Sequence, residues 1–195
     1  MARFDVPCGG ALLALCLVLA APAAAQTSGW QTYSDPVRRF TIDYPPGWTV
    51  DPNFIDKGYG FYQGDTDDMR RGVALKPLGD LAPGSNLESD QLALVVQWAR
   101  PGDLCTASAF LVDPPPDYAT ERPLEKPDIV RTIAEPGDLY TVEQAVILVG
   151  KAPCTAVHYY VNYGRERRGD ARPHFNHETL FGLMNAIAAT YKPLK

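Results

Sequence analysis

Several features that common protein classes require are scarce or absent in this sequence. The 195 residues carry 18 lysines and arginines against 23 aspartates and glutamates, which gives a formal net charge of −5. A chain of this charge has no positive electrostatic footprint, so we expect no nucleic acid among its partners. No Gly-x-Ser-x-Gly segment is present, which excludes the nucleophile elbow of the α/β-hydrolases.

Long apolar runs are scarce too. The run Ala11–Ala21 has the length of a signal-peptide h-region and is too short to span a bilayer. Ala23–Ala25 satisfies the small-residue rule for cleavage, so we predict a signal peptide at residues 1–25 and Gln26 as the mature N-terminus. The alternative is an uncleaved membrane anchor. No later segment is apolar enough to cross a membrane, so we expect a periplasmic or secreted protein after bacterial Sec-type export.

Cysteine is the third scarce feature. Four cysteines are present, and Cys8 and Cys16 lie in the predicted signal peptide. The remaining Cys105 and Cys154 are predicted to form one disulfide, because exported proteins meet an oxidising compartment. Closing a loop of this length stabilises a fold by about 4 kcal/mol in the chain-entropy model. The alternative, a redox-active pair, favours Cys-x-x-Cys spacing, which these two residues lack.

Strand patterns and prolines are abundant. Phe40, Ile42 and Tyr44 alternate with polar residues, which is typical of a half-buried strand, and Pro45–Pro46 ends it. Trp48 follows the turn and is predicted to anchor the core. Further strands are predicted at residues 30–33, 48–51, 58–62, 72–76, 92–98, 140–149 and 155–163, of which the last two form a hairpin.

One helix is predicted near the C-terminus. Asn176 is a good N-cap, and Phe175 and Leu180 have the spacing of a hydrophobic staple. An apolar stripe follows at helical spacing, formed by Leu180, Leu183, Met184, Ile187 and Tyr191. Strands followed by a closing helix are typical of an α+β domain, and we predict a single one at residues 26–195.

Two segments between these elements have open interpretations. Asp103 is a candidate cap for a short helix with one face formed by Cys105, Ser108, Ala109 and Val112, and an extended segment is the alternative. The Pro-rich segment 113–128 is either a binding loop or a stiff surface connection.

The ends of the chain carry a family resemblance. The segment Phe40-x-Ile42-x-Tyr44-Pro45-x-Gly47-Trp48, after the aromatic lead-in at 30–33, resembles the opening signature of the PsbP-like family. Residues 189–192 stand where that family has a Ser-Phe-Lys type ending. The resemblance covers both ends well and the middle poorly. It implies an antiparallel sheet flanked by helices, an α/β/α sandwich, and a non-enzymatic binding or assembly role for an exported bacterial protein.

The segment His174-Phe175-Asn176-His177-Glu178 offers a different function. Two histidines beside a carboxylate suggest a periplasmic or secreted metal-dependent hydrolase that uses His174 and His177, although the order differs from His-Glu-x-x-His. The simpler interpretation makes these ordinary cap or surface histidines. We therefore predict no catalytic residue, metal or cofactor, and a protein or small-molecule partner of unknown identity.

Overall fold

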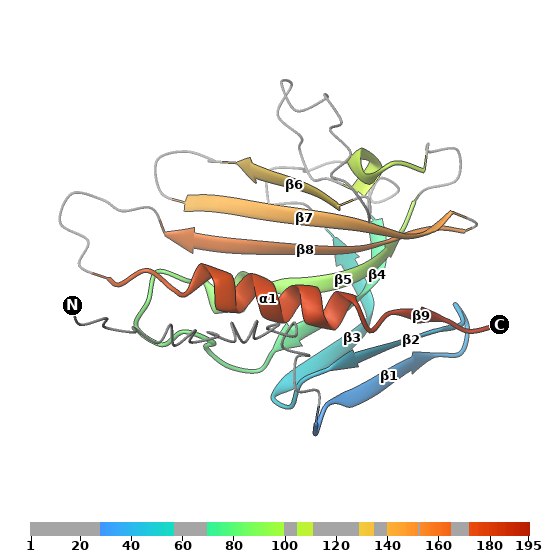
Figure 1. The fold of residues 1–195 in the computed structure, drawn as a ribbon, viewed down its shortest axis with the longest axis horizontal. Coiled ribbons are helices and arrows are strands. Elements are labelled where there is room, and N and C mark those ends of the chain that lie inside the picture. Colours follow the sequence, from blue (N-terminus) through green and yellow to red (C-terminus); the bar gives the residue numbers. More distant parts are fainter. Residues whose placement is uncertain are drawn as a thin grey trace, which may run out of the picture.

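The structure is a computed structural model that describes residues 28–56, 70–99, 105–110, 129–134, 140–151, 153–164 and 172–195. Within these ranges it contains two antiparallel sheets, one α-helix and short 3-10 turns (Figure 1). The elements in chain order are β1 (Gln31–Asp35), β2 (Phe40–Tyr44), β3 (Trp48–Asp56), β4 (Arg70–Pro77), η2 (Ser89–Gln91), β5 (Ala93–Trp98), η3 (Ala107–Phe110), β6 (Ile129–Ala134), β7 (Tyr140–Lys151), β8 (Cys154–Gly164), α1 (His177–Ala188) and β9 (Lys192–Pro193).

The turn after β2 separates the two sheets. The smaller sheet has the order β1-β2-β9, and the larger has the order β3-β4-β5-β8-β7-β6. Pro45 and Pro46 cannot donate to a ladder, and Gly47 adopts a positive φ of 77°, which glycine adopts readily. The chain therefore leaves β2 and pairs β3 with β4, where Trp48 lies opposite Pro77. The family resemblance implies one antiparallel sheet, whereas the described residues form two.

The main core lies between α1 and one face of the larger sheet (Figure 1). Trp48 is 5% exposed in this core, as predicted. The alternation in β8 is also confirmed, because its apolar residues at odd positions are buried toward the helix. Burial of such side chains contributes about 1.5–3 kcal/mol each. The core includes Phe40, Ile42, Leu75, Leu94, Val96, Val157, Tyr159, Val161, Phe181, Met184 and Ile187.

The predicted cap of the helix is confirmed, and so are the stripe positions Leu180, Met184 and Ile187, whereas Tyr191 lies after the end of α1. The Asn176 Oδ1 accepts a hydrogen bond from the backbone N of Thr179 at 2.9 Å, which satisfies one of the free donors of the first turn. Phe175 and Leu180 are both buried in the main core. The buried stripe is wider than predicted, since it also includes Phe181.

The second helical layer of the predicted α/β/α sandwich is not among the described residues. Those residues place one α-helix on one face of the larger sheet, and the other face carries the single 3-10 turn η3. The fold is thus sheet-dominated, and the description "flanked by helices" is corrected to one α-helix. In place of the candidate helix after Asp103, the described residues contain the short 3-10 turn η3. Cys105 precedes this turn.

Cys105 and Cys154 form a disulfide, the pairing expected from the sequence. Their Cα atoms are 5.5 Å apart and 49 residues separate them in sequence. The bond joins the segment before η3 to the first residue of β8. The predicted signal peptide 1–25, the strand 58–62 and the Pro-rich segment 113–128 lie outside the described residues. No helix in the described ranges is long and apolar enough to cross a membrane.

Candidate functional site

The two histidines of the hydrolase hypothesis contact different parts of the fold. His177 is the first residue of α1, and its Nε2 lies 2.7 Å from Oε2 of Glu143 on β7. The Glu143 side chain is 3% exposed and that of His177 is 45% exposed. The imidazole also stacks on Phe181 with the ring centroids 4.3 Å apart. These contacts join the start of the helix to the sheet.

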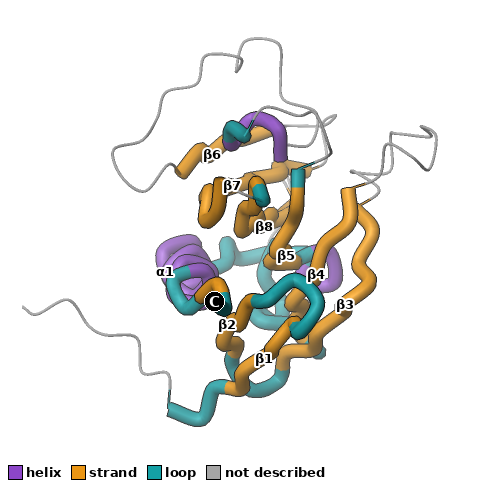
Figure 2. The backbone as a smooth tube through the Cα atoms, turned by 90° about the vertical axis from the view of Figure 1, so that its right-hand side faces the viewer, coloured by secondary structure: helices purple, strands orange, loops and turns teal. Residues whose placement is uncertain are grey.

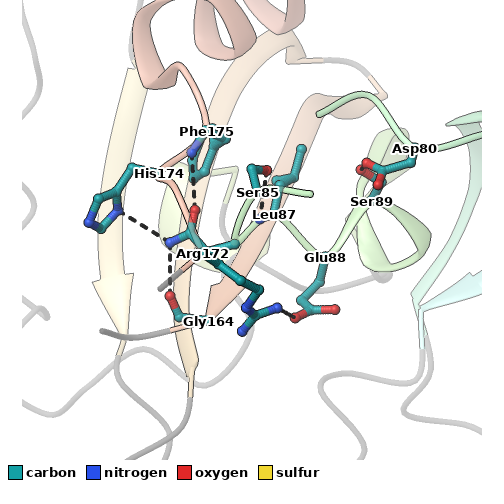
Figure 3. A network of polar contacts seen from close by, with 10 residues as sticks. Asp80, Ser85, Leu87, Glu88, Ser89, Gly164, Arg172, His174 and Phe175 are labelled. Carbon is teal, nitrogen blue, oxygen red and sulfur yellow. Dashed lines mark hydrogen bonds and ion pairs between the residues drawn. The ribbon is translucent and has the colours of Figure 1, made fainter. Parts of the chain in front are cut away.

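His174 belongs to a separate polar network (Figure 3). Its Nδ1 lies 3.3 Å from the side-chain Nδ2 of Asn86, and the His174 side chain is exposed. Asn86 is buried and lies in the loop between β4 and β5. His174 therefore lies over the asparagine that holds this loop, while His177 contacts the sheet.

Asn86 holds three segments together. Its Nδ2 donates to the carbonyl oxygen of Gly164 at 2.9 Å, and its Oδ1 accepts from the backbone N of Phe175 at 3.1 Å. Its backbone N donates to the carbonyl oxygen of Pro173 at 3.0 Å. A buried amide with these partners satisfies its polar atoms. The loop, the end of β8 and the approach to α1 are thus fixed to one another.

Charged and hydroxyl groups line the same loop (Figure 3). An Arg172 nitrogen lies 3.6 Å from the Glu88 carboxylate at the surface. Asp80 accepts hydrogen bonds from the backbone N of Ala82 at 2.9 Å and from the Ser89 hydroxyl at 2.7 Å. These two bonds, the backbone one first, lower the pKa of Asp80. These contacts hold the loop between β4 and β5 in place.

The structure thus does not bring His174 and His177 to one site. Each has its own partner, and within the described ranges no group of three His, Cys, Asp or Glu side chains could hold a metal ion. A catalytic zinc requires about three protein ligands around one point.

The third histidine, His158, is completely buried. It lies on the face of the larger sheet opposite α1, and its ring nitrogens are 3.1 Å from Gln97 Oε1 and 3.2 Å from Gln144 Oε1. The three side chains come from β8, β5 and β7. Sequence reasoning did not identify the two glutamines, because Gln97 stands inside an apolar run.

A different surface gathers aromatic rings at one end of the molecule. Phe40 of β2 stacks on Tyr191, which follows α1, with centroids 5.5 Å apart. It also contacts Trp98 at the end of β5, at 6.2 Å. The guanidinium of Arg38 lies 4.1 Å above the Trp98 ring, a cation–π contact. Trp98 and Tyr191 remain partly exposed, so one side of this cluster is buried and the other faces solvent.

The β1–β2 turn extends this aromatic cluster outward. Asp35 is buried and its Oδ1 accepts from the backbone N of Val37 and Arg38, which fixes the turn. Val37 at the tip is 84% exposed. The backbone N of Leu194 donates to the carbonyl oxygen of Arg39 at 2.6 Å, so the residues after β9 lie beside the turn.

We name this surface the end patch. Its cations are exposed, and the large hydrophobic residues Val37 and Leu194 are exposed among them. Burial raises the pKa of the Tyr191 phenol. The patch therefore joins positive charge with apolar and aromatic surface. It consists of Val37, Arg38, Arg39, Trp98, Tyr191, Lys192 and Leu194.

Comparison with known proteins gives little further information. No protein-family model and no curated protein matches the sequence. Among solved structures, the solution structure of cyanobacterial PsbP (CyanoP) from Synechocystis sp. PCC 6803 aligns with 90% of this chain and 98% of its own, at 13% sequence identity and a TM-score of 0.32. A similarity at this TM-score carries no argument about function.

Proposed function

We propose that the protein is an exported, non-enzymatic binding module whose binding surface is the end patch. In this proposal residues 1–25 are a signal peptide and residues 26–195 form one domain of the PsbP-like type. The observation that carries it is the guanidinium of Arg38 above the Trp98 ring, beside the exposed tip residue Val37. Arginine and tryptophan are enriched among residues that dominate binding energy.

The position of Val37 supports a binding role. A valine at the tip of a turn contributes nothing to the core, and single exposed apolar residues are common. Here, however, Val37 and Leu194 lie in two segments joined by the Leu194–Arg39 hydrogen bond. The same segments carry the partly exposed Tyr191 and the Arg38 that lies over Trp98. Contiguous apolar surface bordered by charge is typical of interaction sites.

The disulfide and the histidine contacts are consistent with the other parts of the proposal. Cys105 and Cys154 are bonded, and such bonds persist in oxidising compartments. His177 joins the helix to Glu143, and His174 contacts Asn86. Both contacts give these histidines structural roles that need no catalysis.

The experiment that tests this proposal is affinity capture from the native envelope with matched bait variants. We expect the wild-type protein to retain a bound component that Val37→Asp and Arg39→Gln lose. The control is Leu78→Asp, because Leu78 is 71% exposed and its backbone N donates to Gly47 at the other end of β2. The control bait should capture the same component as the wild type. Identical capture by all four baits would contradict the proposal.

A further inference from the structure

The end patch has the composition of a peripheral membrane-binding surface. We infer that it docks the protein on an anionic lipid bilayer, with Val37 and Leu194 entering the headgroup region. This inference rests on the proposed function, since it names the partner of the same surface. Three observations carry it: the placement of charge, the exposed apolar residues and the aromatic rings.

Positive charge at this end is exposed to solvent. Arg38, Arg39 and Lys192 are all exposed here. The Asp35 carboxylate in the same turn is buried. It accepts hydrogen bonds from the backbone N of Val37 and Arg38, and Arg38 Nη1 lies 3.7 Å from its Oδ2. The chain as a whole carries −5. An anionic bilayer would repel the net charge of the chain and attract these cations, so the end patch would orient the protein.

The apolar residues stand where they would enter a bilayer first. Val37 is at the tip of the β1–β2 turn, and Leu194 lies beside that turn through its bond to Arg39. Figure 2 looks onto this end, where the turn and the C-terminal residues face the viewer. Apolar side chains among cations are the combination by which peripheral proteins bind the headgroup boundary.

The aromatic rings lie behind these residues. Trp98 and Tyr191 are partly buried against Phe40 and partly exposed. Indole and phenol rings have an apolar body and a polar edge, which suits the membrane–water interface. Exposed cations and apolar side chains can also bind a bilayer without shape complementarity, which a protein interface requires. The patch therefore favours a lipid surface over an acidic protein, which is the other outcome that the test can reveal.

Vesicle sedimentation tests the inference. The protein is purified in the form that the cell produces, and its intact mass records which N-terminus it carries. Vesicles contain phosphatidylcholine alone, or with phosphatidylglycerol as about one third of the lipid. We expect partitioning into the anionic vesicles to be at least about tenfold stronger than into the neutral ones. It should weaken as salt is raised, because salt screens the attraction.

Variants locate the contact. The double variant Arg39→Gln with Lys192→Gln should partition about 25-fold more weakly, since each cation near an anionic surface contributes about fivefold. Val37→Asp should also weaken binding. Arg71→Gln and Leu78→Asp remove an exposed cation and an exposed apolar residue from other parts of the surface, and they should bind as the wild type does. Melting temperatures confirm that each variant is folded.

Three results would overturn the inference. The first is equal binding to neutral and anionic vesicles. The second is binding that the end-patch variants do not change, which would indicate another contact such as a retained N-terminal segment. The third is no vesicle binding while envelope capture still depends on Val37 and Arg39, which would leave the proposed function standing with a protein partner. Loss of both vesicle binding and patch-dependent capture would contradict the proposed function as well.

Discussion

The His177 Nε2 lies 2.7 Å from the Glu143 carboxylate, and this contact joins the first residue of the helix to a buried group of strand β7. The pair gives His177 a structural explanation, while His174 contacts Asn86 instead. The difference between these two histidines can be measured.

His177→Ala should lower the free energy of unfolding by about 1–2 kcal/mol, because it removes a hydrogen bond to a buried carboxylate from a partner that is half exposed. His174→Ala is the matched control, and we expect a change within about 0.5 kcal/mol, since His174 is exposed. Urea unfolding measures both. Equal losses in the two variants would show that the Glu143 contact does not stabilise the fold.

The same two variants test the metal-dependent hydrolase alternative. Elemental analysis of the purified wild-type protein should find no stoichiometric zinc, and neither variant should change the metal content. Zinc bound at one equivalent in the wild type and lost in both His174→Ala and His177→Ala would favour that alternative.

Trp48→Ala should be strongly destabilising. The side chain is 5% exposed at the start of β3 and belongs to the main core. Truncating a buried tryptophan costs about 3–5 kcal/mol through lost burial and the cavity left behind. Leu78→Ala, at an exposed position, serves as the control. A melting temperature for Trp48→Ala equal to that of the parent would contradict the proposed core.

Gly72 is a position where the sheet leaves no room for a side chain. A Cβ there would lie 2.6 Å from Val95 Cγ1 and 2.7 Å from the carbonyl oxygen of Val96. Because one of these atoms is backbone, Gly72→Ala should destabilise the protein by about 1–3 kcal/mol. Gly79 has no atom within 4 Å of an added Cβ, so Gly79→Ala should be tolerated. Similar melting temperatures for the two variants would contradict the pairing of β4 with β5.

The Cys105–Cys154 bond predicts a defined chemical outcome. Non-reducing peptide mapping of the protein from its native source should recover the two cysteines in one linked peptide pair, and a thiol-blocking reagent should label neither. The double variant Cys105→Ser with Cys154→Ser should lose up to about 4 kcal/mol of stability. Full labelling of both residues without a reductant would exclude the bond.

Local patterns predicted much of the fold. The strand at Phe40–Tyr44 follows from its alternation, and the Asn176 cap follows from neighbours within four residues. The division into two sheets could not be predicted, because it depends on which strand β3 selects after the turn at Gly47. The alternation of a strand shows its buried face and leaves its neighbour undetermined.

The candidate site depended even more on distant contacts. Arg38 reaches Trp98 across 60 positions of sequence, and no periodicity connects them. Asn86 meets Gly164 and Phe175 in the same way. The sequence offered His174 and His177 only as an alternative site, because their chemistry was visible within one short segment. The end patch became visible only once the turn, the end of β5 and the C-terminal residues lay side by side.

Site-specific photo-crosslinking in the native envelope tests binding through the end patch most directly. A photoreactive amino acid replaces Val37 in one variant and Leu78 in another, since both side chains are highly exposed but lie at different places on the fold. Our account predicts light-dependent adducts to lipid or protein from position 37 and none from position 78. Adducts from position 78 with none from position 37 would contradict it.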